Sequence, residues 1–329
     1  MTADSGARPH RPSANPARAG AWALAIHGGA GAGSQELGAE ERDAQIRAAL
    51  ADVLAAGATR LSGGASALDA VEDAVKRLED SPLFNAGKGS VFNERGEHEL
   101  DASIMDGASL RAGAVAGLRT VKNPIVLARL VLEHSPHVFL IGEGALAFAE
   151  RHRVELVDQA YFGTERRRAA FEAAKKRETL QTSSLRPGDT GTVGAVALDT
   201  SGNLAAATST GGLTNKAVGR VGDSAVIGAG TFASNRSCAV SCTGQGEMFV
   251  RATAARDVAA LMEYSGLDVR TAAQRGIHER VAGLGGEGGL IAVDKHGRIA
   301  FAFNTRLMLR GAVTHSTAAR VALFDTEQC

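Results

Sequence analysis

Hydrophobic residues in the first half of the chain follow two spacings, one typical of helices and one typical of strands. Apolar positions recur every three or four residues, as on one face of an amphipathic helix, over 40–56, 66–78, 124–132 and 144–153. Short alternating or continuous apolar runs predict strands at 22–26, 98–105, 112–118 and 138–141. Between the first strand and the first helix, the glycine-rich stretch 27–33 is predicted to be a loop.

The pattern changes after residue 162. Residues 162–187 carry a dense basic run with few apolar positions after Phe171, which predicts a helix that frays into an exposed, poorly ordered linker ending near residue 190. Strand patterns return at 193–198, 204–208, 225–229, 237–242, 289–293 and 299–303, and helical patterns at 247–264 and 269–282. Turn residues at 199–203 and 294–297 predict hairpins.

Strands grouped in two blocks, with helices in pairs, favour an α+β protein of stacked sheets and outer helices over an alternating βαβ protein. The 329 residues are enough for one large domain with a substantial core. Residues 1–20 hold three prolines among alanine, arginine and serine, which predicts a disordered N-terminal extension.

Charge and cysteine content narrow the functional classes. Thirty-six basic residues balance 36 acidic ones, which argues against nucleic acid or an anionic membrane as the main partner. The three cysteines form no disulfide framework, and Cys238 and Cys242 share one phase of a predicted strand, so a structural role in a reducing compartment is expected. No apolar run reaches the ~20 residues of a membrane span or the ~7–15 of a signal-peptide core, which predicts a cytoplasmic protein.

Thr192 is the strongest candidate for a catalytic nucleophile. A lone threonine at the start of a strand is usually structural, because its β-branch suits the pleat. Here Gly191 precedes it, and glycine can hold a strained peptide bond. Cleavage of that bond would give Thr192 a free α-amine with a pKa of ~7.7–8.0, able to accept the hydroxyl proton.

Two further glycine-flanked groups lie downstream. Arg220 and Asp223 stand three positions apart; they are either a surface ion pair or a clamp for the carboxylate and ammonium of an amino-acid head group. Thr243 and Gly244 either form an ordinary turn or supply a hydroxyl and an N–H group to an oxyanion.

The loop at 27–33 allows other interpretations, which the sequence does not favour. Its glycine spacing does not match a dinucleotide-binding fingerprint, and no suitable acid follows a second strand. An esterase oxyanion loop would need a Gly-x-Ser-x-Gly elbow, and none occurs in the chain. A tight turn between a strand and a helix is the simplest alternative.

Taken in order, the motifs resemble those of the plant-type L-asparaginases, or isoaspartyl peptidases, of the N-terminal nucleophile hydrolases. The resemblance covers about residues 23–304 and is carried by HGGAG at 27–31, PLFNAG at 82–87, LDASIMDG at 100–107, GTVG at 191–194, STGG at 209–212, GRVGD at 219–223 and CTG at 242–244. Together these motifs are highly specific.

This resemblance implies a four-layer αββα sandwich that is made as an inactive precursor. Autocatalytic cleavage between Gly191 and Thr192 would leave an α chain (21–191) and a β chain (192–329), both contributing to one folded domain. The family's mature form is a homodimer of such αβ units. No cofactor is implied for catalysis.

Roles follow by position. Thr192 would be the nucleophile, Thr210 its hydroxyl partner, and Thr243 with Gly244 the oxyanion hole. Arg220 and Asp223 would hold the substrate, beside Gly211, with Asn85 supporting the site. The loop from Leu78 to Lys88 resembles the family's structural sodium site, whose backbone carbonyl donors would be Leu78, Glu79, Ser81, Phe84, Ala86 and Lys88.

The implied substrates are L-asparagine and β-aspartyl dipeptides. A glycosylasparaginase-like amidase and a cleavage-dead amino-acid-binding relative are the alternatives. The chain departs from the family pattern near its end, where Arg306-Leu307 replace the usual Glu-Gly and the following tail matches nothing recognisable. Substrate preference or C-terminal packing is where this departure would act.

Overall fold

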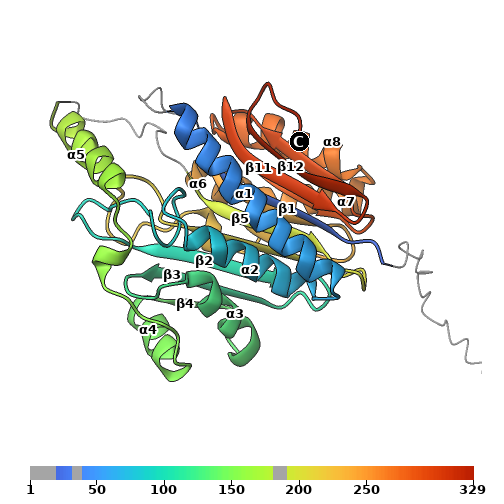
Figure 1. The fold of residues 1–329 in the computed structure, drawn as a ribbon, viewed down its shortest axis with the longest axis horizontal. Helices are drawn as coiled ribbons and strands as arrows, with labels where there is room; N and C mark the ends of the chain where they lie inside the picture. The colour runs from blue at the N-terminus through green and yellow to red at the C-terminus, as the bar shows by residue number, and fades with distance from the viewer. Residues whose placement is uncertain (1–19, 32–38, 181–190) are drawn as a thin grey trace, which may run out of the picture.

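The computed structural model describes residues 20–31, 39–180 and 191–329, and within them it is a mixed α+β structure (Figure 1). The larger sheet has the strand order β12-β11-β1-β5-β6-β2-β3-β4, and the smaller one β10-β9-β8-β7. The larger sheet's strands are β1 (Ala23–Gly31), β2 (Leu100–Asp106), β3 (Ala112–Leu118), β4 (Phe139–Ile141), β5 (Val193–Leu198), β6 (Leu204–Thr210), β11 (Leu307–Thr314) and β12 (Thr317–Phe324). The smaller sheet's are β7 (Thr231–Ala233), β8 (Cys238–Gly244), β9 (Gly288–Asp294) and β10 (Ile299–Phe303).

The helices pack against the two sheets in separate groups. Figure 1 shows α1 and α2 lying across the larger sheet, which they and α3 contact. Helices α7 and α8 contact the smaller sheet. The helix bounds are α1 (Ala39–Ser62), α2 (Ala67–Glu79), α3 (Pro124–His134), α4 (Gly142–Arg151), α5 (Glu165–Leu180), α6 (Gly246–Ala252), α7 (Ala254–Ser265) and α8 (Val269–Arg275).

Strand alternation sorts side chains between two cores. On β1, Leu24 and Ile26 belong to the cluster shared with α1, α2 and α3, whereas Ala23 and Ala25 belong to the cluster shared with β8 and β9 of the other sheet. Successive strand residues point to opposite faces. The same rule divides β5 and β6, so residues at a known phase of a strand can be assigned to one core or the other.

The predicted loop at 27–33 is wrong for its first part, because β1 continues to Gly31. His27, Ala30 and Gly31 pair with β11 as strand residues, and the register shifts between His27 and Gly29. A side chain at Gly28 would meet the Phe84 ring at 2.6 Å. The glycines therefore permit a bulge and a close approach within a strand. Residues 32–38 lie outside the described residues.

The C-terminal tail, unplaced by its sequence, is the hairpin β11–β12, which extends the larger sheet beside β1. Buried Arg310 interrupts the apolar pattern of β11, which explains why the strand was not predicted. Its guanidinium donates to the Met308 carbonyl at 2.9 Å and the Phe324 carbonyl at 3.2 Å. Leu307 opens this strand, so the departure from the family pattern coincides with a well-paired element.

Three other predicted elements need correction. The helix predicted over 247–264 is two helices, because Thr253 adopts the left-handed conformation between α6 and α7. Helix α8 ends at Arg275 and a π-helical turn continues to Val281. The strand predicted at 225–229 lies later, at β7. The predicted hairpins β5–β6 and β9–β10 are confirmed.

The charge of the basic segment predicted an exposed linker, but the start of this segment is partly buried. Phe162 and Arg167 are buried, and Arg167 Nε donates to the Gly89 carbonyl at 2.6 Å, which attaches the start of α5 to the domain. Residues 181–190, the rest of the predicted linker, and residues 1–19 of the predicted extension lie outside the described residues.

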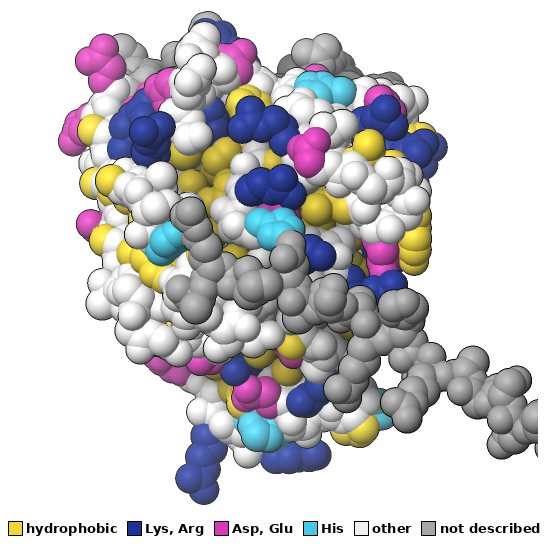
Figure 2. Space-filling view, turned by 90° about the vertical axis from the view of Figure 1, so that its right-hand side faces the viewer, with side chains coloured by type: hydrophobic (Ala, Val, Ile, Leu, Met, Phe, Trp, Pro, Cys, Tyr) yellow, Lys and Arg dark blue, Asp and Glu magenta, His cyan; other side chains and the backbone are white. Residues whose placement is uncertain are grey.

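Surface and core chemistry agree with the composition. On the face shown in Figure 2, basic side chains lie interspersed with acidic and hydrophobic ones. Cys238 and Cys242 are both buried free thiols on the helix-facing side of β8, as predicted from their common phase. Among the described helices, none combines the length and hydrophobicity needed to cross a membrane.

We expect Gly113→Ala to lower the free energy of unfolding by ~1–3 kcal/mol, because it overpacks the contact between β3 and α3. A methyl group at Gly113 would overlap the Ala128 carbonyl oxygen and lie 2.6 Å from the Leu132 nitrogen, both rigid backbone atoms. Gly144→Ala is the matched control, since open space surrounds that position in α4 and alanine favours a helix. Urea unfolding would measure both; equal midpoints for Gly113→Ala and wild type would contradict this packing.

Candidate active site

Thr192 and Thr210 are brought together by the β5–β6 hairpin. Val193, the first residue of β5, pairs with Ser209 of β6, so the two threonines stand beside each other at the end of the hairpin. Thr192 Oγ1 donates to Thr210 Oγ1 at 3.0 Å, and the Gly212 N–H group donates to the same oxygen at 3.0 Å. Both threonine side chains are buried. The predicted hydroxyl pair is therefore present and held in place by backbone.

The hydroxyl pair opens into a small, mostly polar hollow, here called the Thr192 pocket. It is lined by Thr192, Thr210, Gly212, Leu213, Arg220, Gly222, Asp223, Ser224 and Gly244. Its walls come from the residue before β5, the end of β6, the segment after β6 and the end of β8. Four of the residues predicted from the motifs as nucleophile, hydroxyl partner and clamp line this one hollow.

Arg220 is held by a partner that the sequence did not indicate. Its Nε and Nη2 atoms donate to the two carboxylate oxygens of Glu247 in α6, at 2.8 and 2.9 Å. This is the two-pronged geometry that fixes a guanidinium plane. The remaining Nη1 atom lies toward Gly212 and Gly222, where added side chains would sit within 3.3 Å of it. The glycines thus leave the free edge of the guanidinium open to the pocket.

Asp223 is a buried carboxyl group whose hydrogen bonding within the described residues is incomplete. It is 3% exposed, and its Oδ2 atom has no hydrogen-bond partner among the described residues. Burial raises the pKa of Asp223 to about 7, against the smaller lowering effect of nearby Arg220. An ammonium group placed against Oδ2 would pair this atom and favour the ionised carboxylate.

Asn85 links the segments on either side of the hydroxyl pair. Its side-chain amide donates to the Gly212 carbonyl at 2.7 Å, and its side-chain oxygen accepts from the Val91 N–H group at 2.9 Å. Its main-chain N–H group donates to the Gly191 carbonyl at 3.0 Å, and its carbonyl accepts from Gly211 at 3.0 Å. A supporting role was predicted; the direct contact with the Gly191 carbonyl was not.

Thr243 and Gly244 end β8 beside the pocket. The Thr243 hydroxyl oxygen accepts from the Ala30 N–H group at 3.2 Å, which leaves its own proton for another acceptor. Gly244 lines the pocket, and a side chain there would lie 2.5 Å from the Glu287 carbonyl. These two residues are suited to donating hydrogen bonds, although only Gly244 is among the lining residues.

The loop after α2 winds tightly around its own carbonyl groups. The Lys88 N–H group donates to the Glu79 carbonyl at 2.7 Å, and a side chain at Gly89 would lie within 2.8 Å of the Pro82 and Phe84 carbonyl oxygens. The Glu79 side chain accepts from the Ser209 hydroxyl at 2.6 Å and from the Ile125 N–H group at 3.0 Å. Burial raises the pKa of Glu79 to about 8. The loop is thereby tied to β6 behind the hydroxyl pair.

Sequence reasoning missed two residues near the site. Glu247 is the first residue of the helix predicted over 247–264, and no motif marked it. His27 had been placed in a loop, yet it is a fully buried strand residue whose Nδ1 atom lies 3.0 Å from the Thr192 carbonyl oxygen. The alternation along β1, with His27 in phase with Ala23 and Ala25, was a signal that could have placed it between the sheets.

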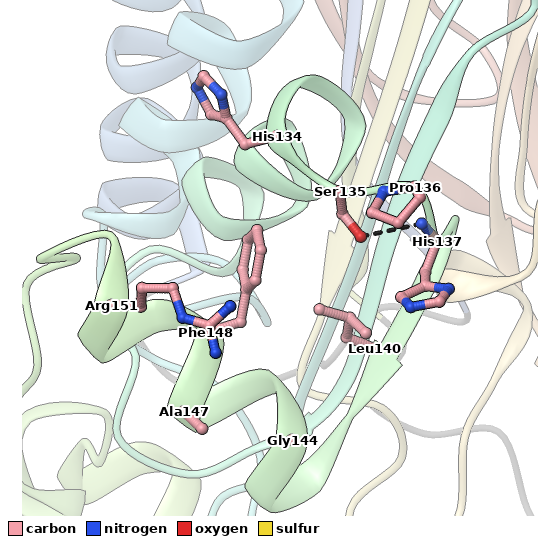
Figure 3. Close-up of a pocket in the computed structure, with 9 residues that line it drawn as sticks. All are labelled: His134, Ser135, Pro136, His137, Leu140, Gly144, Ala147, Phe148 and Arg151. Atoms are coloured by element: carbon pink, nitrogen blue, oxygen red, sulfur yellow. Dashed lines mark hydrogen bonds between the residues drawn. The ribbon is translucent and has the colours of Figure 1, made fainter.

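A second hollow lies away from these residues, between α3, β4 and α4. Figure 3 shows Phe148 and Arg151 of α4 on one side and Pro136, His137 and Leu140 on the other. The Ser135 hydroxyl accepts from the His137 N–H group at 2.9 Å. None of the site residues predicted from the motifs lines it, so the Thr192 pocket is the candidate active site.

Comparison with known proteins identifies the family of the chain. The family model of the asparaginases matches residues 20–323. An isoaspartyl peptidase of Escherichia coli (strain K12) is 52% identical over 292 residues, covering 87% of this chain and 91% of its own. A probable isoaspartyl peptidase/L-asparaginase of Arabidopsis thaliana is 44% identical, covering 93% of this chain and all of its own. A Mus musculus isoaspartyl peptidase/L-asparaginase is 46% identical, covering 83% and 82%.

These matches define the class of the protein, a hydrolase of the asparaginase type. The chain belongs to the isoaspartyl peptidase/L-asparaginase family, as the resemblance of its motifs predicted.

Proposed function

We propose that this protein is a self-cleaving threonine hydrolase that acts on the β-amide of L-asparagine and of β-aspartyl dipeptides. The observation that carries the proposal is the Thr192–Thr210 hydroxyl pair, 3.0 Å apart, in one pocket with Arg220 and Asp223. The names of its relatives, which include isoaspartyl peptidases and L-asparaginases, support the same substrates.

Self-cleavage uses the same hydroxyl group as the later reaction. Thr192 Oγ1 attacks the Gly191 carbonyl carbon and a C–O bond forms. The Gly191–Thr192 C–N bond breaks, and the hydroxyl proton passes to the Thr192 nitrogen, which gives an ester and a free α-amine. Water then hydrolyses the ester. The Asn85 N–H group, 3.0 Å from the Gly191 carbonyl oxygen, is placed to stabilise negative charge on that oxygen during the attack.

In the mature enzyme, the α-amine of Thr192 takes the hydroxyl proton while Oγ1 attacks the substrate's β-carbonyl carbon. The Thr243 hydroxyl and the Gly244 N–H group stabilise the oxyanion. Ammonia or an amino acid leaves with a proton, and water hydrolyses the β-aspartyl ester on Thr192. Thr210 and the Gly212 N–H group keep the hydroxyl oriented.

The substrate head group is held by two opposite charges. The Nη1 edge of Arg220 faces the pocket and suits an α-carboxylate, while Asp223 Oδ2, which has no partner in the described part of the chain, suits an α-ammonium. Asparagine and β-aspartyl dipeptides share this head group, so one clamp serves both. Gly211, beside Thr210, permits the close approach of Asn85 and Ser90, whose atoms would lie 2.6 Å from a side chain at this position.

The direct test is release of aspartate by the purified wild-type protein from L-asparagine, β-aspartyl-leucine and a glycosyl-asparagine. We expect release from the first two and little from the third. Release mainly from glycosyl-asparagine would replace the proposal with the amidase alternative. Aspartate binding without release from any substrate would favour the amino-acid-binding alternative.

Binding of the head group should weaken at low pH because ionised Asp223 is required. The pKa of this carboxyl is raised to about 7, so it is neutral below that pH, and the inhibition constant of L-aspartate should rise about tenfold per pH unit as the pH falls below 7. In Asp223→Asn the inhibition constant should be high and lack this dependence. A wild-type inhibition constant that is flat from pH 8 to pH 5.5 would contradict the assignment.

We also propose that the loop after α2 holds a structural sodium ion. Its converging backbone oxygens, of the kind seen at Pro82 and Phe84 around Gly89, suit a hard monovalent cation. The donors would be the carbonyl groups of Leu78, Glu79, Ser81, Phe84, Ala86 and Lys88. The ion would supply local rigidity behind β6 and no step of the reaction.

The remaining proposals concern assembly and location. Outer helix groups, two sheets and a cluster shared between the sheets support a four-layer αββα sandwich built from both cleavage products as one domain. A homodimer of such αβ units follows from the family resemblance. The buried free thiols Cys238 and Cys242 support a reducing, cytoplasmic location.

A further inference from the structure

A continuous line of buried polar side chains runs behind Thr192 through the space between the two sheets. His27 Nδ1 lies 3.0 Å from the Thr192 carbonyl oxygen, and His27 Nε2 lies 2.9 Å from Ser241 Oγ. Ser241 Oγ lies 2.7 Å from Thr208 Oγ1, which accepts from Thr231 Oγ1 at 2.6 Å. Ser103 Oγ ends the line, 2.8 Å from Thr231 Oγ1. We call these five residues the polar chain.

Strand alternation explains why these residues meet. His27 follows Ala23 and Ala25 in phase on β1, and Thr208 follows Ala206 on β6; all three alanines belong to the cluster between the sheets. Ser241 is likewise in phase with Ala239 of β8. The core between the sheets therefore changes from apolar to polar at the level of Thr192.

The donors and acceptors nearest Thr192 fix the positions of the protons on His27 and Ser241. The Thr192 carbonyl can only accept, so His27 must carry its proton on Nδ1. Burial lowers the pKa of His27 to about 3, so the ring is neutral and Nε2 has no proton. Nε2 must then accept from Ser241. The single Ser241 proton is thereby used, so Ser241 accepts from Thr208.

Distances favour the same direction farther along. Thr208 has an alternative acceptor in the Gly230 carbonyl, but at 3.2 Å against 2.7 Å to Ser241. Thr231 then donates to Thr208. The single Ser103 proton is shared between two acceptors, Thr231 Oγ1 at 2.8 Å and the Ser224 carbonyl oxygen at 2.6 Å, and Ser224 lines the Thr192 pocket beside Asp223. The polar chain thus connects the backbone of Thr192 with the wall that carries Asp223.

We propose that the polar chain holds the Thr192 backbone in its reactive position, with His27 as the neutral Nδ1–H tautomer and Ser241 donating a hydrogen bond to its Nε2 atom. His27, Ser241 and Thr208 are then positioning residues, because they act on Oγ1 through the main chain of Thr192 and touch no substrate. The proposal rests on the proposed role of Thr192 as nucleophile.

Gly194 shows how closely this arrangement is built. A side chain at Gly194 would overlap both Ser241 Oγ and His27 Nε2. The hydrogen bond between them passes directly over the backbone of β5, two residues after Thr192. A glycine in the GTVG motif, which the threonine chemistry itself does not require, is therefore explained by the polar chain.

The test uses variants that separate the two nitrogens of His27. His27→Asn can keep a donor to the Thr192 carbonyl, since its amide nitrogen can replace Nδ1, whereas His27→Leu removes it. We expect kcat for L-asparagine to fall about 10- to 100-fold in His27→Leu, with KM within about twofold, and to recover mostly in His27→Asn. All values refer to the cleaved fraction, measured by mass spectrometry. Equal kcat in both variants would overturn the proposal.

Ser241→Ala keeps the proposal testable if the histidine variants do not fold. We expect a fall in kcat of about 3- to 10-fold with unchanged KM. Nitrogen NMR of histidine-labelled protein should show the Nδ1–H tautomer for His27 in the wild type, and a shifted Nε2 resonance in Ser241→Ala, because that atom loses its hydrogen-bond donor. Ser237→Ala, a buried hydroxyl just before β8 and outside the polar chain, should match the wild type.

The two proposals fail in different ways. If the wild type neither cleaves nor releases aspartate, the proposed function fails. If the wild type is active but His27 is the Nε2–H tautomer, or Ser241→Ala retains full kcat, only the polar-chain proposal fails.

Discussion

The purified wild-type protein is expected to consist of two chains of about 20 and 14 kDa, while Thr192→Ala remains one chain of 33.8 kDa. Cleavage before Thr192 divides the chain after residue 191, and the two masses are the share of 33.8 kDa that corresponds to the length of each fragment. Alanine removes the hydroxyl group that must attack the Gly191 carbonyl, so no ester can form. Intact-mass spectrometry of aged protein measures both species directly.

The same substitution should abolish hydrolysis. Loss of a nucleophile that acts as a unit with its activating base typically lowers kcat by about 10⁴-fold or more. Thr192→Ser is the control: it keeps a hydroxyl group and should still cleave, more slowly because serine is less constrained about χ1. If wild type and Thr192→Ala both stay whole, Thr192 is not a self-cleaving nucleophile and the binding-protein alternative takes precedence.

Arg220→Ala should lower kcat/KM for L-asparagine by about 100-fold, mainly through KM, while self-cleavage proceeds as in wild type. The substrate carboxylate loses its charge partner, but the Gly191–Thr192 bond belongs to the chain itself and needs no clamp. Steady-state kinetics and intact mass on the same preparation separate the two effects. Unchanged activity toward asparagine would refute the clamp.

Related variants locate the cause. Arg220→Lys keeps the charge but not the two-pronged contact with Glu247, so an intermediate loss is expected. Glu247→Gln should raise KM less than Arg220→Ala does, because it loosens the guanidinium without removing it. Arg251→Ala, an exposed cation of the same helix outside the pocket, should match the wild type.

Local sequence patterns predicted an element correctly where its apolar spacing and turn residues are regular. The helices near 66–78 and 124–132 and the hairpins β5–β6 and β9–β10 follow from apolar spacing and turn residues, and the structure confirms them. The mixed α+β class is confirmed as well. The assignment of strands to the two sheets was not predictable in this way. β5 and β6 belong to the larger sheet with β1, whereas β7 and β8, which follow them in sequence, belong to the smaller sheet.

Errors arose where distant partners determine conformation. The glycines after His27 read as a loop, because only pairing with β11 shows that they are a bulged strand edge. β11 was missed because Arg310 breaks its pattern, and the carbonyl groups that satisfy this buried cation come from its own hairpin. In both cases a stabilising partner lies on another strand: β11 for the glycines of β1, and Phe324 of β12 for Arg310. A short stretch of sequence does not show such a partner.

The sequence by itself determined the chemistry available: the Gly191-Thr192 pair, the hydroxyl groups, the Arg220/Asp223 charges and the glycines that leave room around them. These features depend on residue type and on short spacings, both of which can be taken directly from the sequence. Only the tertiary structure decided which groups work together. Glu247 on Arg220, Asn85 on the Gly191 carbonyl and His27 behind Thr192 are contacts between separate elements, and pairing and packing of the strands set them.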